Sequence, residues 1–549
     1  MLNKKLLLLV DSVTYYQILA MRIVIFIFLF ALAKFGFSQD LKSGGKLKPE
    51  QANMDIRHYT ISLDVDPDKQ TIDGFVLIDL QLLKPGNRLI LDLWNGYTVK
   101  SVLVNGKSVG FDHSNDLITM NSPVEWPAGK TTIKVLYGGK PGIAERAPWT
   151  GGIQWSKDGQ GNHWIAQTCQ GEGAKIFFPC KDHPSDEPNE GADMIITVPR
   201  GLTAVGPGIL QKSSTKKNKT SWHWKTNYTI SNYCLVFNIG KFTTVQREYT
   251  TVKGNKVPMI FYVLEEHKDK GPHLLEMLER TTKILEKYFG EYPWAKERIG
   301  LCETPHLGME HQTNIAYGNK FNYTKVGGED FDWLMNHEFG HEWWANKVSN
   351  RDWAHMWIQE GICTYGDNLY YRDMEGEESY MKRMRQIART QNSPIPIVRG
   401  EEVDSDSAYK GPIYGKGAFF MHTLRYVVGD DIFFPTLLKL ATDPLYTYDS
   451  TVTTADVEKL FSTASGKNLK ELFHLFLYTA NKLEIKVSQT AENKYLVQLL
   501  NYEGVLPIDV TTDTGTQKIE VNKKGVSVSS NSMIQVDPAV WYLKRVIYE

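Results

Sequence analysis

The strongest chemical signal in this 549-residue chain lies between residues 330 and 361. His337, Glu338 and His341 form the pattern H-E-x-x-H, and Glu360 follows after a gap of 18 residues. Residues four apart lie on one face of an α-helix, so the two histidines are expected to converge on one ion. Two imidazole nitrogens and one carboxylate suit zinc with one open position, and Glu338 can accept a proton from the metal-bound water. The pattern predicts the chemistry of a zinc hydrolase.

An alternative interpretation is a surface helix on which two histidines and a glutamate are simply solvated. The surrounding residues disfavour it, because they would make the helix apolar on several faces, as in a buried helix. Those residues are Phe339, Trp343, Trp344, Ala345 and Val348. Histidines and glutamates buried together are costly without a partner, and a metal ion would provide one.

Composition excludes some classes of partner. With 62 basic and 63 acidic residues, the chain has no excess of one charge that would favour nucleic acid or an anionic membrane. The basic run 212–219 lacks interleaved aromatic residues and is interpreted as a solvated hairpin loop. The five cysteines contain no C-x-x-C pair. Buried free thiols are the preferred interpretation, and a disulfide between Cys169 and Cys180 remains open.

The first 38 residues are interpreted as a signal peptide. Met21-Arg22 precedes an apolar run, Ile23 to Ala33, which is short for a membrane span and suitable for a signal-peptide core. Cleavage is expected near Ser38, and Met21 is a candidate for the true initiator. A membrane anchor is the alternative. The signal peptide predicts export to the periplasm or the extracellular space, with no stable membrane insertion after cleavage.

Hydrophobic periodicity divides the rest of the chain into three domains. Alternation of apolar and polar residues predicts an all-β, mostly antiparallel domain over 39–250. Helical spacing begins with Leu274 and Leu278 and stops at Gly290. Helices are expected to dominate the catalytic domain, 251–481, apart from short strands near 295–320. Alternation returns over 482–549, which predicts a small C-terminal β domain.

Several motifs together resemble the gluzincin aminopeptidases, the family of aminopeptidase N and leukotriene hydrolase. They are H-E-x-x-H with the distant Glu360, Gly308-Met309-Glu310-His311 (G-x-M-E-N), Trp357-Ile358-Gln359-Glu360-Gly361 (W-L-x-E-G), Tyr414-Gly415-Lys416-Gly417 (Y-x-K-G) and Phe178-Pro179-Cys180-Lys181-Asp182 (F-P-C-x-D). They occur in the order that the family shows. The resemblance implies a thermolysin-like α+β catalytic domain between the all-β N-terminal domain and a small C-terminal β-sandwich.

The resemblance also implies a role for each matching residue. One Zn²⁺ per chain would be held by His337, His341 and Glu360, with Glu338 as general base. Tyr414 would stabilise the oxyanion. Glu310 would bind the free α-ammonium group of a peptide substrate, Gln170 would lie near it, and Gly308 and Met309 would contact the peptide backbone. The expected activity is removal of N-terminal residues from peptides by metal-activated water.

Two departures from the family pattern bear on this expectation. His311 stands where the family usually has asparagine, and the large helical domain that caps the site in many relatives is not expected after residue 481. Asp367 is a candidate second-shell carboxylate for a ligand histidine, with a surface acid as the alternative. The competing functions are an endopeptidase or other hydrolase on the same zinc site, and a catalytically silent peptide-binding relative.

Overall fold

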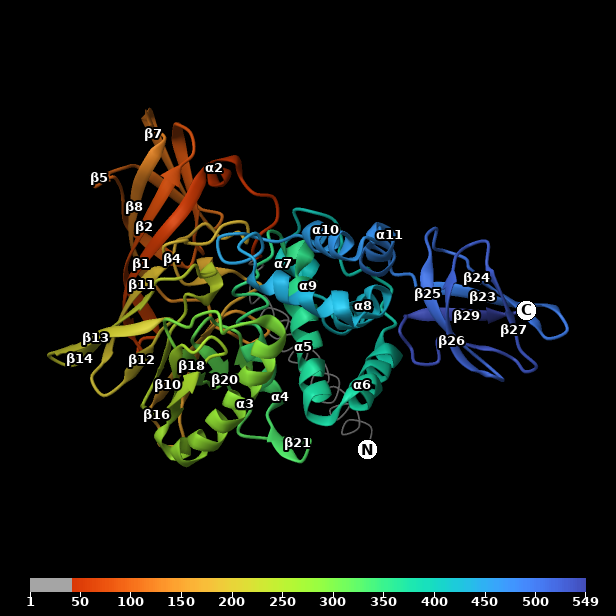
Figure 1. The fold of residues 1–549 in the computed structure, drawn as a ribbon. Helices are drawn as coiled ribbons and strands as arrows, with labels where there is room; N and C mark the ends of the chain where they lie inside the picture. The colour runs from red at the N-terminus through yellow and green to blue at the C-terminus, as the bar shows by residue number, and fades with distance from the viewer. Residues whose placement is uncertain (1–41) are drawn as a thin grey trace, which may run out of the picture. The chain divides into compact units, whose positions relative to one another are not determined.

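The structure, a computed structural model, describes residues 42–549 (Figure 1). The segment interpreted as a signal peptide, with Met21 and the expected cleavage near Ser38, lies outside the described residues. Among the helices of residues 42–549, none is both long enough and apolar enough to cross a membrane.

The N-terminal region is built from β-sheets, as its alternating sequence predicts. Its largest sheet has eight strands in the order β13-β14-β11-β1-β2-β8-β4-β5, and only the β1–β11 pair is parallel. The strands are β1 (Met54–Asp66), β2 (Thr71–Leu82), β4 (Tyr97–Val104), β5 (Lys107–Ser108), β8 (Gly129–Gly139), β11 (Ala192–Pro199), β13 (Ile209–Lys216) and β14 (Lys219–Thr226). Strand β1 buries every second side chain, including Ile61, Leu63 and Val65, against the core.

Two smaller sheets complete this region. One has the order β12-β15-β10-β9, and the other has the order β3-β7-β6. Their strands are β3 (Gly86–Asp92), β6 (Phe111–Ser114), β7 (Leu117–Trp126), β9 (Gly152–Lys157), β10 (His163–Thr168), β12 (Thr203–Val205) and β15 (Asn238–Gly240). Strand β10 matters most for the site, because the chain continues from its carboxyl end directly into Gln170.

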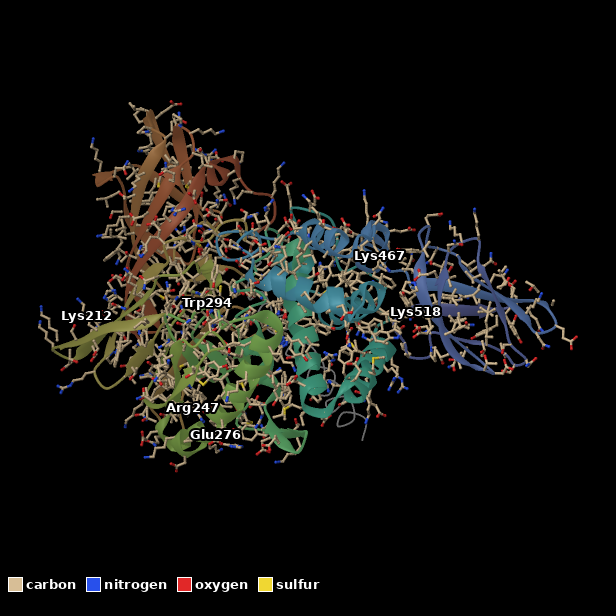
Figure 2. All side chains as sticks on the ribbon, in the orientation of Figure 1. Lys212, Arg247, Glu276, Trp294, Lys467 and Lys518 are labelled. Atoms are coloured by element: carbon tan, nitrogen blue, oxygen red, sulfur yellow. The ribbon has the colours of Figure 1, made fainter. Side chains whose placement is uncertain are left out.

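The basic run 212–219 forms the end of a hairpin, including its turn, rather than a loop alone. Strands β13 and β14 pair through this run, and only Lys217 and Asn218 make the turn. All eight residues of β13 are exposed, and Lys212 lies at the periphery of the side-chain view (Figure 2). The prediction of a solvated hairpin is therefore right about its exposure, although its strands are longer than expected.

The catalytic region begins with a five-stranded sheet in the order β16-β17-β18-β20-β19. Its strands are β16 (Phe242–Thr250), β17 (Lys256–Leu264), β18 (Ile299–Glu303), β19 (Gly308–Met309) and β20 (Ile315–Tyr317). Strand β16 pairs with β17 along its whole length, so this sheet starts at Phe242. The boundary predicted after residue 250 would separate β16 from β17, the strand with which it pairs. The alternating pattern does not indicate this pairing, because β16 has the same period as the strands before it.

Apart from the short hairpin of β21 (Thr324–Val326) and β22 (Glu329–Phe331), helices form most of the rest of the catalytic region. They are α3 (Gly271–Phe289), α4 (Trp333–Gly340), α5 (Trp357–Glu375), α6 (Glu377–Thr390), α7 (Ser405–Ala408), α8 (Pro412–Val428), α9 (Asp430–Thr442), α10 (Thr454–Ser465) and α11 (Lys470–Phe473). Helix α3 confirms the predicted 3.6-residue spacing, with Leu274 and Leu278 buried. It ends at Gly290, whose φ of 79° is one that other residues adopt only with strain.

The C-terminal region contains two antiparallel or mixed sheets. Strands β27-β24-β23-β29 form one sheet and β26-β25-β28 form the other. They are β23 (Leu483–Ala491), β24 (Lys494–Leu499), β25 (Leu506–Thr512), β26 (Gly515–Val521), β27 (Val526–Ser529), β28 (Gln535–Val536) and β29 (Lys544–Tyr548). The alternating residues Leu483, Ile485 and Val487 are all buried, as predicted.

All five cysteines lie among the described residues and are buried free thiols. The preferred interpretation is confirmed, and a Cys169–Cys180 disulfide is not formed.

Candidate active site

Helix α4 and the start of α5 bring the three predicted metal ligands together. The Nε2 atoms of His337 and His341 are 3.3 Å apart, and they lie 3.7 and 3.4 Å from Oε2 of Glu360. Tetrahedral zinc with bonds of about 2.0–2.1 Å separates its ligand atoms by roughly 3.3–3.5 Å. Oε2 of Glu360 is buried and accepts no hydrogen bond within residues 42–549, so a cation would satisfy it. The donor set therefore fits zinc.

Both histidines are oriented by contacts on their other ring nitrogen. Nδ1 of His337 is 2.8 Å from Oδ2 of Asp367, and Nδ1 of His341 is 2.8 Å from the carbonyl oxygen of Trp344. Such partners fix the imidazole so that Nε2 faces the metal. The contact expected between Asp367 and a ligand histidine is therefore present. Asn336 donates to its other oxygen at 2.7 Å and holds the carboxylate in place.

A second possible triplet replaces Glu360 with Cys363. The donor atoms of His337, His341 and Cys363 lie within 4.8 Å of one another. However, Sγ of Cys363 contacts the carbonyl oxygen of His337 at 3.1 Å and approaches the ring of His337 at Nδ1, the nitrogen bound to Asp367. Cys363 therefore lies behind the imidazole, and Glu360 is the better third ligand.

The helix that carries the histidines is shorter than the sequence suggests. Helix α4 ends at Gly340, and the backbone then forms wider turns in which the N–H groups of Asn346 and Val348 bond to the fifth residue back. Trp343, Trp344 and Val348 are fully buried, as expected, but they lie beyond the helix. Their apolar character therefore reflects burial of the turns rather than of several helix faces.

Glycines in two motifs allow α5 and α8 to meet closely. A Cβ atom at Gly361 would lie 2.8 Å from Cα of Gly417, and one at Gly417 would lie 2.9 Å from Cα of Gly361. This contact places Tyr414 beside Glu360, and its hydroxyl donates to Oε1 at 2.9 Å. Burial alone would raise the pKa of Glu360, but the two imidazoles hold it at about 2. Glu360 is therefore anionic, as a ligand must be.

Glu338 faces the same space without sharing the metal position. Its side chain is buried, and burial raises the pKa of its carboxyl to about 7 despite the nearby imidazoles. Gly308 makes room for it, because a Cβ at that position would lie 2.8 Å from Oε1 of Glu338. A buried carboxylate with a pKa near neutrality suits a general base.

Hydrogen bonds hold the carboxylate of Glu310 in a fixed position in the same cavity. Gln170 donates to its Oε1 at 2.7 Å and Tyr233 does so at 2.9 Å, while Asn346 fixes its backbone carbonyl at 2.8 Å. Only 4% of the residue is exposed. The bonds that residues 42–549 make to this carboxylate go to Oε1, which leaves Oε2 open to the cavity. Such an oxygen can accept a bond from an ammonium group.

The residues before and after Glu310 differ in their access to the cavity. Strand β19 (Gly308–Met309) is the last strand of its sheet, so its outer edge has backbone groups available to an extended peptide. His311 is fully buried and does not line the cavity. Its difference from the family asparagine therefore does not change the surface that a substrate would meet.

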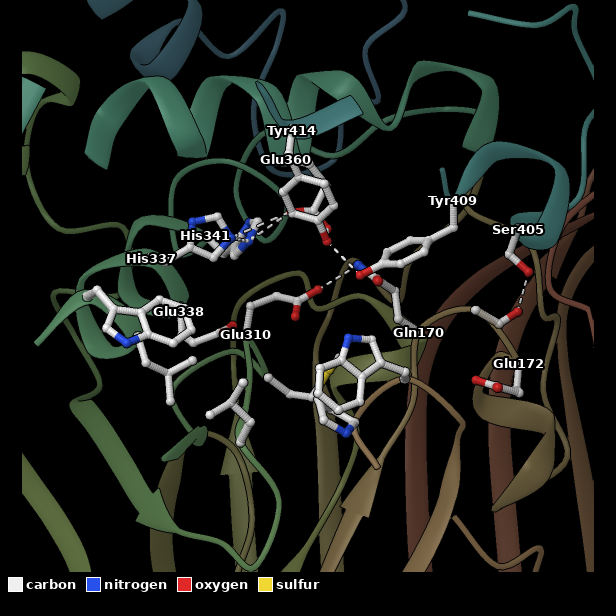
Figure 3. A pocket seen from close by; sticks show the side chains of 18 of the residues that line it. Gln170, Glu172, Glu310, His337, Glu338, His341, Glu360, Ser405, Tyr409 and Tyr414 are labelled. Carbon is white, nitrogen blue, oxygen red and sulfur yellow. Dashed lines mark hydrogen bonds and ion pairs between the residues drawn. The ribbon is translucent and has the colours of Figure 1, made fainter. Parts of the chain in front are cut away.

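All the predicted site residues line one cavity of about 300 Å³ (Figure 3). Sequence reasoning missed other members of this cavity, because they come from segments with no recognisable motif. Tyr409 lies 2.5 Å from the hydroxyl of Tyr414, and the exposed rings of Trp149 and Trp333 also line the cavity.

The fold and donor set define a single-metal site of the H-E-x-x-H type. Residues 56–234 match the Peptidase M1 N-terminal domain, and residues 273–476 match the Peptidase family M1 domain. The chain belongs to peptidase family M1, the gluzincin family that its motifs resemble.

Similar proteins include leukotriene A-4 hydrolase from Xenopus laevis, 25% identical over 71% of this chain and 65% of that protein. Tricorn protease-interacting factor F2 from Thermoplasma acidophilum is 20% identical over 82% of this chain and 58% of that protein. The chain thus spans about half to two thirds of the length of these relatives.

Solved structures of an M1 zinc metallopeptidase from Deinococcus radiodurans share the fold. A glutamate-to-alanine variant bound to a Tyr-Ser-Ala substrate has a TM-score of 0.64 at 22% identity, and the match covers 77% of this chain and 94% of that one. The unmutated enzyme gives the same TM-score.

Proposed function

We propose that the protein is a zinc-dependent aminopeptidase that removes N-terminal residues from peptides. One observation carries the proposal: a buried carboxyl side chain, Glu310, shares a cavity with the metal ligands and with the base Glu338. A peptide whose ammonium group bonds to Oε2 of Glu310 would present its first peptide bond toward that base. A substrate without a free amine would leave Oε2 of Glu310 without a partner, which is costly.

One Zn²⁺ per chain would be held by His337, His341 and Glu360. When bound, it supplies Lewis acidity that polarises the scissile carbonyl and lowers the pKa of a water molecule. Glu338 accepts the proton of the attacking water and transfers it to the leaving amine. The hydroxyl of Tyr414 lies beside Glu360, where it can donate to the oxygen that becomes negatively charged. The edge of β19 would hold the peptide backbone.

The test compares one short peptide with a free N-terminus against the same peptide after N-acetylation. We expect zinc-loaded protein to cut only the free peptide, one residue at a time. Removal of the metal by a chelator should abolish cleavage, and added zinc should restore it. Equal cleavage of both peptides would favour an endopeptidase, and binding without cleavage would favour a silent relative.

Tyr409 is expected to support Tyr414. When the Tyr414 hydroxyl donates to an oxyanion, the hydroxyl of Tyr409 can donate to the oxygen of Tyr414. Hydrogen bonds linked in a chain in this way strengthen each other. Tyr409→Phe should lower kcat about 3- to 10-fold with little change in KM, since a hydrogen bond contributes about 0.5–1.5 kcal/mol. Steady-state kinetics with Tyr414→Phe and the double variant provide the control. A Tyr409→Phe effect that persists without the Tyr414 hydroxyl would contradict this coupling.

Four further features belong to the proposal. The apolar run Ile23 to Ala33 supports export to the periplasm or extracellular space after cleavage of a signal peptide. The catalytic region is proposed to be thermolysin-like, and the two C-terminal sheets are proposed to form a β-sandwich. We place the domain boundaries near residues 241 and 482.

A further inference from the structure

A second cavity, of about 290 Å³, lies between helix α6 and the C-terminal β region. Four of its lining side chains are cationic: Arg385 and Arg389 from α6, Lys482 from the residue before β23, and Lys544 from the start of β29. Among the described residues that line it, none is acidic. Like charges gathered around one hollow repel each other and attract an anion.

Of these four cations, only Lys544 is paired with a carboxylate of the described residues. Lys544 pairs with Asp537 at 2.8 Å, and Lys482 donates to the side-chain oxygen of Asn392 at 2.8 Å. Arg385 and Arg389 have no carboxylate oxygen within 4.0 Å anywhere in residues 42–549. They are four residues apart on α6, so their guanidinium groups lie on one helix face.

The positive region continues into an adjoining cavity of about 140 Å³, which shares Lys482 and Leu543 with the first. Lys416 lines this second space, is only 5% exposed, and donates to the carbonyl oxygen of Thr479 at 2.9 Å. The described lining of this space also contains no carboxylate.

The wall opposite α6 has a strained backbone. Val540 lines the cavity with φ of 67°, a value that is a genuine outlier for a β-branched residue. Helix α8 holds this wall in place. Nε2 of His422 lies 3.3 Å from the carbonyl oxygen of Val540, and Thr423 donates to that of Trp541 at 2.7 Å. Residues kept in such conformations cluster at ligand sites.

We propose that this cavity binds the phosphate group of a small organic phosphate ester. Paired guanidinium groups present parallel N–H donors that match phosphate oxygens, and Lys482 adds a point charge. The cavity is larger than a phosphate ion needs, and Val540 and Leu543 give it apolar surface for an organic group. This site is separate from the cavity that contains Glu310 and Glu338, so it does not depend on the proposed peptidase activity.

The test is titration of the zinc-loaded, full-length protein with glycerol 2-phosphate and, separately, with orthophosphate. Calorimetry and thermal melting would be run at constant ionic strength. Wild type should show saturable binding and a rise in Tm. Arg385→Gln and Arg389→Gln should each weaken binding about tenfold or more, because each removes a charge-assisted contact. Lys382→Gln is the matched control, since Lys382 is an exposed cation of α6 outside the cavity.

Tighter binding of the ester than of orthophosphate supports the proposal as stated. Equal weakening by Lys382→Gln would show general surface charge, and unchanged binding in both arginine variants would place the anion elsewhere, including at the metal. Either result overturns the proposal, as does absence of saturable binding or a preference for orthophosphate. The Tm of each variant without ligand monitors folding. If Arg385→Gln does not fold, Arg389→Gln, whose side chain is exposed, decides alone.

Discussion

Glu338→Gln is expected to lower kcat about 10²- to 10⁴-fold while leaving zinc content and peptide binding nearly unchanged. Glutamine keeps the size of the side chain and can still hydrogen-bond, but it cannot accept a proton at neutral pH. Glu338 does not coordinate in the arrangement of His337, His341 and Glu360, so the metal should remain bound. The measurements are steady-state kinetics, metal analysis and peptide binding by calorimetry.

The matched control is Glu378→Gln, which removes one exposed carboxylate from α6. Its kcat should equal that of wild type within error. Two results would contradict the assignment of Glu338 as the base. One is activity within a few-fold of wild type. The other is loss of zinc together with activity, which would mean that Glu338 supports the metal site rather than proton transfer.

The local chemistry of the site could be predicted from the sequence because helical spacing fixes it. His337 and His341 are one turn apart, so their convergence needs no tertiary information. Glu360 and Tyr414 could be assigned only through family motifs, since their meeting depends on the close contact of α5 and α8. The glycines of both motifs have a physical reason in the structure, because Gly361 and Gly417 touch.

Tertiary contacts account for what could not be predicted. Tyr233 comes from a turn in the β-rich region and reaches Glu310 only in the folded chain. Helix α4 stops at Gly340, although the sequence stays apolar beyond it. Trp343 and Trp344 are apolar because the turns that contain them are buried. The sequence of a buried segment is equally apolar whether the segment is a helix or a turn. The pairing of β16 with β17 could not be predicted for a similar reason, since a period of two does not identify the sheet that a strand joins.

The basic cavity could likewise not be predicted from the sequence. On α6, Arg385 and Arg389 belong to the polar face of an amphipathic helix, and such charges are usually solvated. Only the approach of Lys482 and Val540 from the C-terminal region turns that face into the wall of a cavity.

Glu310→Ala is expected to remove the preference for a free N-terminus. In wild type the α-ammonium group would bond to Oε2 of Glu310, and a buried charge-assisted hydrogen bond contributes about 1.5–3 kcal/mol. The variant should therefore lose about 10- to 100-fold in kcat/KM on the free peptide. The acetylated peptide should not become a worse substrate, since it never made this contact. The ratio of kcat/KM for the two peptides is the measurement that decides.

Tyr233→Phe is the graded control for this prediction, because it removes one neutral donor to Oε1 and leaves the carboxylate. The loss of kcat/KM on the free peptide should be several-fold smaller for Tyr233→Phe than for Glu310→Ala. The preference of wild type should also fall as pH rises through about 8, where the peptide α-ammonium loses its proton. If Glu310→Ala cleaves the free peptide as well as wild type does, the amine is bound elsewhere. The chain would then be a zinc hydrolase whose specificity does not come from Glu310.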